Sequence, residues 1–265
     1  MNLSVSNFAW PQHQALWCYE QLAKRNIKGI EIAPTKVFGD QWCIEAEHIA
    51  ELKQTLSLFD LEVSSLQGLT YGKPDLALHG EGSQVFLQHM QRIVEIMQST
   101  EAEIAVFGAA KLRQCKPSDV QEIYALFEQL GHRYAMSSKT LTIEPIPKAY
   151  GAQYLSTLSE CKHLVNVVNQ PGFALTFDTA NAFLSGDLMS GNYKNVLHKA
   201  KHVHVSEPDL CYFHQPSKFN IELAGDIKRH YQGHWVVLEM GDKHFTRSGF
   251  VRSLDNFIRL YAQST

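Results

Sequence analysis

Short apolar segments rich in β-branched residues alternate along the chain with longer segments whose apolar residues recur every three or four positions. The short segments predict β-strands at residues 3–7, 28–33, 62–67, 104–108, 140–144, 173–178, 202–206 and 235–239. The longer segments predict amphipathic helices, most clearly over 45–60, 85–97, 117–136 and 247–262. Successive strands begin about 25 to 42 residues apart, which is the length of one strand–helix unit.

This alternation predicts an α/β fold of the (β/α)₈ TIM-barrel type, as a single domain over residues 1–265. An open, doubly wound sheet shows the same alternation. Its dinucleotide-binding form would carry Gly-x-Gly-x-x-Gly after an early strand, and the sequence lacks that motif. Long connections follow three predicted strands, at 34–44, 68–82 and 207–219. In a barrel they would lie on the face where active sites form.

The composition is that of a folded protein, with 45% hydrophobic and 19% charged residues and a net charge of −3 when histidine is neutral. No run of lysine and arginine occurs, which argues against nucleic acid as a partner and favours a small-molecule ligand. The five cysteines are scattered and form no Cys-x-x-Cys pair, as is typical of reduced thiols.

The first residues lack the charged start and long apolar run of a signal peptide, and no apolar stretch nears the roughly 20 residues that span a bilayer. We therefore expect a soluble, cytoplasmic protein with no membrane partner. A homodimer is one expected form.

Four predicted strands end on, or contain near their end, a residue that can bind a hard metal ion. These residues are Glu144, Asp178, His204 and Glu239. In a parallel barrel their side chains would converge at its mouth, where three carboxylates without a cation would repel one another. We predict a site for one divalent ion, Mn²⁺, Mg²⁺, Co²⁺ or Zn²⁺, and the absence of thiolates argues against structural zinc.

Each of these residues also has an ordinary structural explanation. A carboxylate that ends a strand can cap a helix or pair with a lysine, and a histidine in an apolar strand can be a core residue. Their occurrence at four successive strand ends favours the metal site. Glu31 lies within an apolar strand, where a charge needs a partner. We expect it to form a buried ion pair, or to line the barrel and orient a neighbour of the ligand.

With these motifs the chain resembles the xylose isomerase-like barrels, and among them the ketose 3-epimerases and hydroxypyruvate isomerases, together called sugar phosphate isomerases/epimerases. The resemblance covers most of the chain and is carried by Gly29-Ile30-Glu31-Ile32, Ile143-Glu144-Pro145, Phe177-Asp178-Thr179-Ala180-Asn181, His204-Val205-Ser206-Glu207 and Leu238-Glu239. It implies that the four predicted ligands hold one divalent metal, commonly manganese. It also implies that Glu144 and Glu239 flank the substrate carbon and move protons.

The activity implied by the resemblance is the isomerisation or epimerisation of a small sugar or sugar phosphate, by proton transfer through a metal-bound enediolate. Dehydratases of the inosose or dehydroshikimate type share this barrel and form an alternative. Apurinic endonucleases of the superfamily bind three zinc ions through extra histidines, which this chain lacks at Gln67 and Asn181. A non-catalytic binding protein is a further alternative, and the presence of all four ligands argues against it.

The chain departs from the epimerases at positions that grip the sugar. Asn181 stands in place of a histidine, Leu210 in place of an arginine and Tyr150 in place of a second glutamate. The resemblance therefore extends to the whole metal set but not to the residues that grip a free ketose.

Several residues at or beyond the strand ends are candidate substrate contacts, and each could equally be a packing or surface residue. They are Trp10, Gln67, Tyr71, Lys148, Asn181 and Glu207. Phosphate often binds near the last strands of such barrels. Lys148, Lys243, His244 and Arg247 could therefore hold a phosphorylated or acidic sugar, although a solvated charged loop accounts for them as well.

Overall fold

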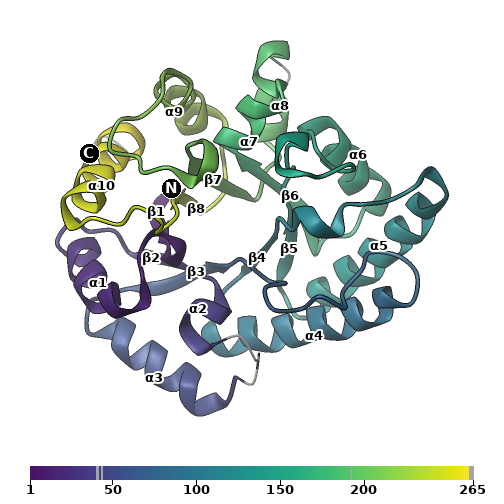
Figure 1. The fold of residues 1–265 in the computed structure, drawn as a ribbon, viewed down its shortest axis with the longest axis horizontal. Coiled ribbons are helices and arrows are strands. Elements are labelled where there is room, and N and C mark those ends of the chain that lie inside the picture. Colours follow the sequence, from purple (N-terminus) through teal and green to yellow (C-terminus); the bar gives the residue numbers. More distant parts are fainter. Residues whose placement is uncertain (40–41, 43, 192, 263–265) are drawn as a thin grey trace.

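The strands form a closed central barrel, and the helices form a layer around it (Figure 1). The computed structural model describes residues 1–39, 42, 44–191 and 193–262. These residues form the parallel strands β1 (Asn2–Ser6), β2 (Gly29–Ile32), β3 (Glu62–Leu66), β4 (Ile104–Phe107), β5 (Thr140–Ile143), β6 (Phe173–Asp178), β7 (His202–Ser206) and β8 (Trp235–Glu239). The predicted barrel is confirmed, and every predicted strand end lies within one residue of the observed end.

The pairing of the first strand with the last excludes the open sheet. β1 runs parallel to β8 in a register that places Asn2 beside Trp235 and Val5 beside Leu238. The other strands neighbour one another in chain order. The carboxyl ends of all the strands therefore open on one face of the barrel.

The α-helices lie between successive strands and after the last one, as the periodicity predicts. They are α1 (Ala15–Ala23), α2 (Pro34–Phe38), α3 (Ala46–Ser57), α4 (Gly82–Thr100), α5 (Val120–Met136), α6 (Leu158–Val168), α7 (Thr179–Leu184), α8 (Tyr193–Leu197), α9 (Lys218–His230) and α10 (Arg247–Tyr261). Short 3₁₀ helices lie at Asn7–Ala9, Gln12–Gln14, Ala110–Leu112, Pro117–Asp119, Lys148–Tyr150, Asp187–Ser190 and Pro208–Leu210.

Two of the predicted segments differ locally from the structure. The helix predicted over 117–136 begins with a 3₁₀ turn and becomes α-helical only at Val120. The segment 34–44, expected as a loop, contains the short helix α2. Pro34 starts this helix, since its fixed φ suits the first helical position and its missing N–H has no helical partner there.

Side chains alternate between the two faces of the barrel wall, and β7 shows the division. Val203 and Val205 belong to the apolar core. His202 and His204 reach Glu31 on the non-adjacent strand β2, so they point into the barrel. Branched apolar side chains usually fill such an interior. Here hydrogen-bonded polar groups occupy much of the interior.

A register shift between β2 and β3 adds to this polar interior. Ile30 pairs with Val63, but the next residue, Glu31, pairs with Ser65, so Ser64 is an extra residue on β3. As a result both serines reach interior partners. The hydroxyl of Ser64 lies 2.7 Å from that of Ser4, and the hydroxyl of Ser65 donates to Glu31 at 2.8 Å.

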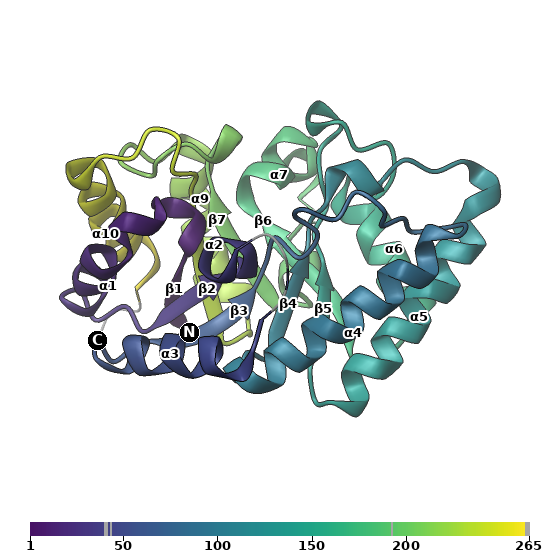
Figure 2. The same cartoon turned by 60° about the horizontal axis from the view of Figure 1, so that its bottom comes forward.

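The side view shows the helices packed along the outside of the strands, with long connections at one end of the barrel (Figure 2). None of the helices in the described part of the chain is long and apolar enough to cross a membrane.

Candidate metal-binding active site

Four predicted ligands meet at the mouth of the barrel. Glu144 directly follows β5, Asp178 ends β6, His204 lies in β7 and Glu239 ends β8. One oxygen or nitrogen atom from each lies within 4.8 Å of the atoms from the other three. Nδ1 of His204 is 3.1 Å from Oε1 of Glu144 and 3.4 Å from Oε2 of Glu239. All four side chains are buried, with exposed fractions of 0 to 8%.

Asp178 is held in place through both carboxylate oxygens. Oδ1 accepts a hydrogen bond from the backbone N–H of Asn181 at 2.6 Å and so caps α7. Oδ2 accepts from the hydroxyl of Ser206 at 2.7 Å. Each oxygen still has free lone pairs, so Asp178 can cap the helix and bind a metal ion at the same time.

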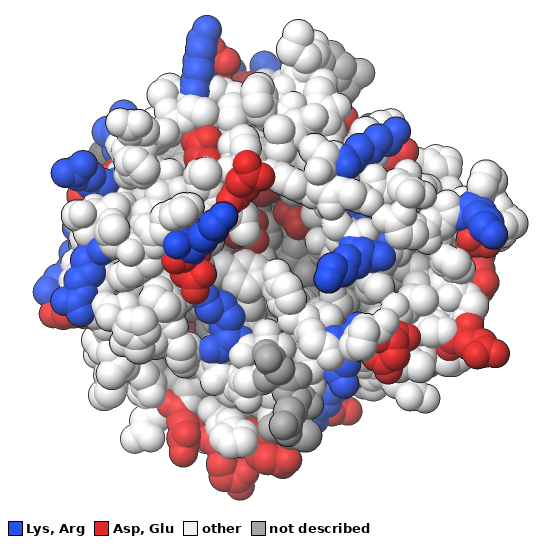
Figure 3. Space-filling view, viewed as in Figure 1, with Lys and Arg blue, Asp and Glu red and all other residues white. Residues whose placement is uncertain are grey.

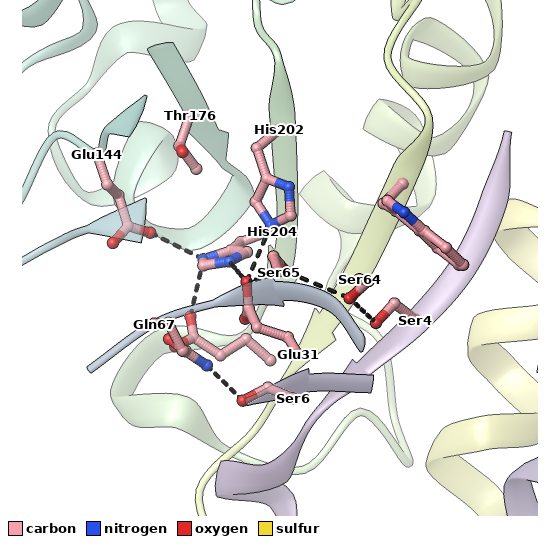
Figure 4. Close-up of polar contacts among 12 residues, drawn as sticks. Ser4, Ser6, Glu31, Ser64, Ser65, Gln67, Glu144, Thr176, His202 and His204 are labelled. Carbon is pink, nitrogen blue, oxygen red and sulfur yellow. Dashed lines mark hydrogen bonds and ion pairs between the residues drawn. The ribbon is translucent and has the colours of Figure 1, made fainter. Parts of the chain in front are cut away.

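The ring of His204 lies between two acidic neighbourhoods (Figure 4). Its Nδ1 atom faces Glu144 and Glu239, while its Nε2 atom is 3.1 Å from Oε2 of Glu31. Burial alone would raise the pKa of Glu31, but His204 and His202 outweigh it and hold that pKa below the usual range of a glutamate. A lowered pKa favours the ionised carboxylate, and both histidines lie within hydrogen-bond distance of it, so Glu31 has the buried partners that a charge in an apolar strand needs.

The cluster has the electrostatics of a cation site. Burial raises the pKa of Asp178 well above its usual range, and the charges of Glu144 and Glu239 add to this. Burial also raises the pKa of Glu239, against the opposing effect of His204. The pKa of His204 is well above its ordinary value: burial would lower it, but Glu31 and Glu239 outweigh that effect. These groups hold excess protons, and a divalent ion bound by three oxygens and one nitrogen would displace them. The donor set therefore fits a metal.

A cavity of about 960 Å³ opens above the cluster, which is the upper end of the usual range for ligand sites. Glu144, Asp178 and Glu239 line it. The space-filling view shows acidic side chains in a hollow at the centre of this face, with both basic and acidic side chains around its rim (Figure 3).

Four predicted substrate contacts line this cavity: Gln67, Tyr71, Asn181 and Glu207. Glu207 is the most firmly held of these, since its Oε1 accepts from the backbone N–H of Ser217 at 2.8 Å and from the Asn220 amide at 2.9 Å. The amide of Gln67 donates to the hydroxyl of Ser6. Tyr71 is partly exposed, and desolvation in the cavity, and then the charge of Glu239, raise the pKa of its hydroxyl.

The other two predicted contacts, Trp10 and Lys148, are not among the residues that line the cavity. Trp10 is buried against Tyr19 and Phe250, with ring centroids 6.0 and 5.7 Å away. The 3₁₀ turn after β1 carries the chain away from the barrel mouth, and the aromatic side chain joins the core between helices. Lys148 is exposed in a 3₁₀ turn.

Tyr150, Lys73, Lys111 and Gly108 are among the cavity residues that were not predicted as substrate contacts. Tyr150, at the position of the missing glutamate, accepts a hydrogen bond from the backbone N–H of Asp209 at 2.8 Å. Lys73 and Lys111 line the half of the cavity beyond β3 and β4. Gly108 directly follows β4, and a Cβ at this residue would lie 2.2 Å from Oε2 of Glu144. Gly108 could have been predicted from the sequence, because a glycine immediately after a barrel strand indicates a close approach of another group to the backbone.

A closed parallel barrel with three carboxylates and an imidazole at its mouth defines a TIM barrel with a candidate metal site. The chain belongs to the xylose isomerase-like TIM barrel family, whose model matches residues 19–254. No curated protein matches it significantly.

Solved structures with the same fold include enzymes of three kinds. D-psicose 3-epimerase from Clostridium cellulolyticum H10 has a TM-score of 0.76 and 12% identity, over 100% of both chains. A probable 3-DHS dehydratase from Bacillus anthracis has a TM-score of 0.70 and 14% identity, over 99% of this chain and 100% of that one. A family 2 AP endonuclease from Brucella melitensis has a TM-score of 0.72 and 17% identity, over 94% and 96%. These similarities establish the fold.

Proposed function

We propose that the protein is a divalent-metal-dependent isomerase or epimerase of a small sugar or sugar phosphate, with Mn²⁺ as the preferred ion. The observation that carries this proposal is the pair Glu144 and Glu239. Both carboxylates lie within 3.4 Å of the same nitrogen of His204, and both line the cavity. A bound cation would polarise a carbonyl group and make the neighbouring C–H more acidic.

The two glutamates can remove and return a proton at one substrate carbon. They come from β5 and β8, on opposite sides of the intervening ligands from β6 and β7, so they can reach the carbon from different directions. One carboxylate takes the proton to give an enediolate, and the same or the other carboxylate returns it. A carboxylate in hydrogen-bond reach of a substrate carbon's proton is a suitable acid–base group, and both glutamates line the cavity.

Exchange with solvent tests this proposal directly. In D₂O, the protein loaded with Mn²⁺ and incubated with a panel of ketoses and ketose phosphates is expected to incorporate deuterium at one carbon of a sugar that keeps all its hydroxyl groups. NMR of the recovered sugar measures this. Loss of a hydroxyl group with a new enone absorbance would instead identify a dehydratase. Nicking of abasic DNA would identify an endonuclease, and either result would contradict the proposal.

The cavity wall carries two lysines beside its five carboxylates, and these lysines suit an anionic group on the substrate. The metal-ligand residues come from β5 to β8, whereas Lys73 and Lys111 follow β3 and β4 in the other half of the barrel. Among the described residues no carboxylate forms an ion pair with either lysine, and the cavity carboxylates all belong to β5 to β8 or to the segments that follow these strands. A phosphate or carboxylate group on the part of the sugar distant from the reacting carbon would supply the missing partner.

The double variant Lys73→Gln/Lys111→Gln is expected to raise KM for a phosphorylated substrate by about tenfold or more, since hydrogen bonds to charged groups contribute about 1.5–3 kcal/mol each. KM for the corresponding unphosphorylated sugar should change by less than about twofold. Steady-state kinetics on the matched pair of substrates measures both. The control is Lys199→Gln. Lys199 is an exposed residue that precedes β7, at the end of the barrel opposite the cavity. Equal losses for the two substrates would contradict a phosphate contact.

A further inference from the structure

Glu31 is the centre of a buried hydrogen-bond network beneath the candidate metal site (Figure 4). A single oxygen, Oε2, is 2.8 Å from the hydroxyl of Ser65, 3.0 Å from Nε2 of His202 and 3.1 Å from Nε2 of His204. All four residues are fully buried. An ionised carboxylate only accepts hydrogen bonds, so both imidazoles must carry a hydrogen on Nε2.

This arrangement decides which nitrogen of His204 can bind a cation. A ring that donates Nε2–H to Glu31 offers its lone pair at Nδ1, and Nδ1 is the atom that faces Glu144 and Glu239. We propose that Glu31 is a positioning residue that fixes the tautomer and ring orientation of His204 for metal binding, with His202 holding the carboxylate from a second side. This inference rests on the proposed function, because it assumes the cation.

The same three residues, Glu31, His202 and His204, are also close enough to hold a metal ion of their own. His204 belongs to both groups, so filling both would require its ring to lose both hydrogens and bridge two cations. A cation beside Glu31 would also displace the hydrogen bonds that this oxygen accepts from the imidazoles. One cation, supported from below by a hydrogen-bonded carboxylate, is the simpler arrangement and is common around metal-bound histidines.

Unsatisfied atoms in the network support a functional role. Oε1 of Glu31 and Nδ1 of His202 are buried and have no hydrogen-bond partner among the described residues. Buried polar atoms without partners cost free energy, and native proteins keep few of them. A trio that served only the stability of the barrel would gain from pairing these atoms. The geometry instead directs every strong contact to the one oxygen that faces His204.

Zinc binding to the whole protein tests the positioning role without an activity assay. Isothermal titration calorimetry with Zn²⁺ is expected to give one site per chain, with the dissociation constant raised about 10- to 100-fold by Glu31→Leu. Glu31→Gln keeps an acceptor oxygen of similar shape and is expected to lose less affinity. Ser65→Ala removes another donor to the same oxygen while leaving both histidines paired, so its affinity should stay within about twofold of wild type.

A spectroscopic signature separates positioning from a general structural effect. In the zinc-loaded, ¹⁵N-histidine-labelled protein, long-range ¹H–¹⁵N spectra should show His204 protonated at Nε2 in wild type and Ser65→Ala, and this signature should be lost in Glu31→Leu. If Glu31→Leu does not fold, the affinity and spectrum of Glu31→Gln decide the question. Wild-type affinity and an unchanged spectrum in the Glu31 variants would overturn the inference and leave the proposed function intact. Two zinc ions per chain would overturn the single-site arrangement. Failure of the wild-type protein to bind zinc or manganese would overturn the proposed function itself.

Discussion

Replacing Glu239 with glutamine is expected to slow deuterium exchange at the substrate carbon by about 10²–10⁴-fold, the contribution of a positioned acid–base group. Glutamine has nearly the same shape but cannot take up a proton. Glu144→Gln is expected to show a loss of the same size, because this carboxylate contacts the same nitrogen of His204 from the other side. The rate of deuterium incorporation in the Mn²⁺-loaded variants measures both effects.

These two glutamates are also candidate ligands, so metal content must be measured for each variant. A variant that retains about one metal ion per chain but loses exchange has lost proton transfer, whereas a variant that loses the ion has lost the site. Glu128→Gln, on the exposed face of α5, is the matched control and should behave as wild type. Near-normal exchange in metal-loaded Glu144→Gln and Glu239→Gln would remove both residues from the mechanism.

The variant Gly108→Ala is expected to weaken metal affinity and turnover by about 10- to 100-fold, a loss typical of disturbed support around a metal ligand. A Cβ at residue 108 would lie 2.2 Å from Oε2 of Glu144, so the carboxylate must swing away from the other ligands. Because the atom that moves is the end of a flexible side chain, the melting temperature should change little. Calorimetric metal titration and thermal unfolding of the same sample separate the two effects.

Gly225→Ala is the matched control for this substitution. Gly225 lies in α9, and a Cβ there would meet no described atom within 4 Å. Alanine in a helix interior stabilises by about 0.5–1 kcal/mol relative to glycine, so this variant should unfold at a slightly higher temperature with unchanged metal affinity. Unchanged metal affinity in Gly108→Ala as well would show that Glu144 does not need its observed position.

The barrel and its metal-ligand candidates could be predicted from the sequence because both follow from the strand pattern. An apolar segment such as 173–178 defines where a strand ends, and parallel strands in a barrel bring their carboxyl ends together. Asp178, at the last position of its strand, is therefore placed by the fold alone. The same reasoning applies to Glu239.

The remaining parts of the site depend on backbone paths that periodicity does not encode. The extra residue on β3 brings Ser64 and Ser65 to interior partners, and no repeat in the sequence marks it. Trp10 follows a strand but turns into the core, because a 3₁₀ turn intervenes. Lys73 and Lys111 enter the cavity through the connections after β3 and β4, where side-chain direction depends on the course of each loop.

The polar interior has a consequence for how this barrel could be redesigned. Hydroxyl and carboxylate contacts run without a break from Ser4 through Ser64, Ser65 and Glu31 to His204, at 2.7, 3.2, 2.8 and 3.1 Å. Loss of one serine hydroxyl leaves Glu31 and both histidines paired, but replacing the whole column with aliphatic side chains, a common route to thermostability, would remove Glu31 and with it the partner of His204. Substitutions intended to change the substrate are better placed in the connections around the cavity. These connections can be altered while the hydrogen-bonded residues inside the barrel stay unchanged.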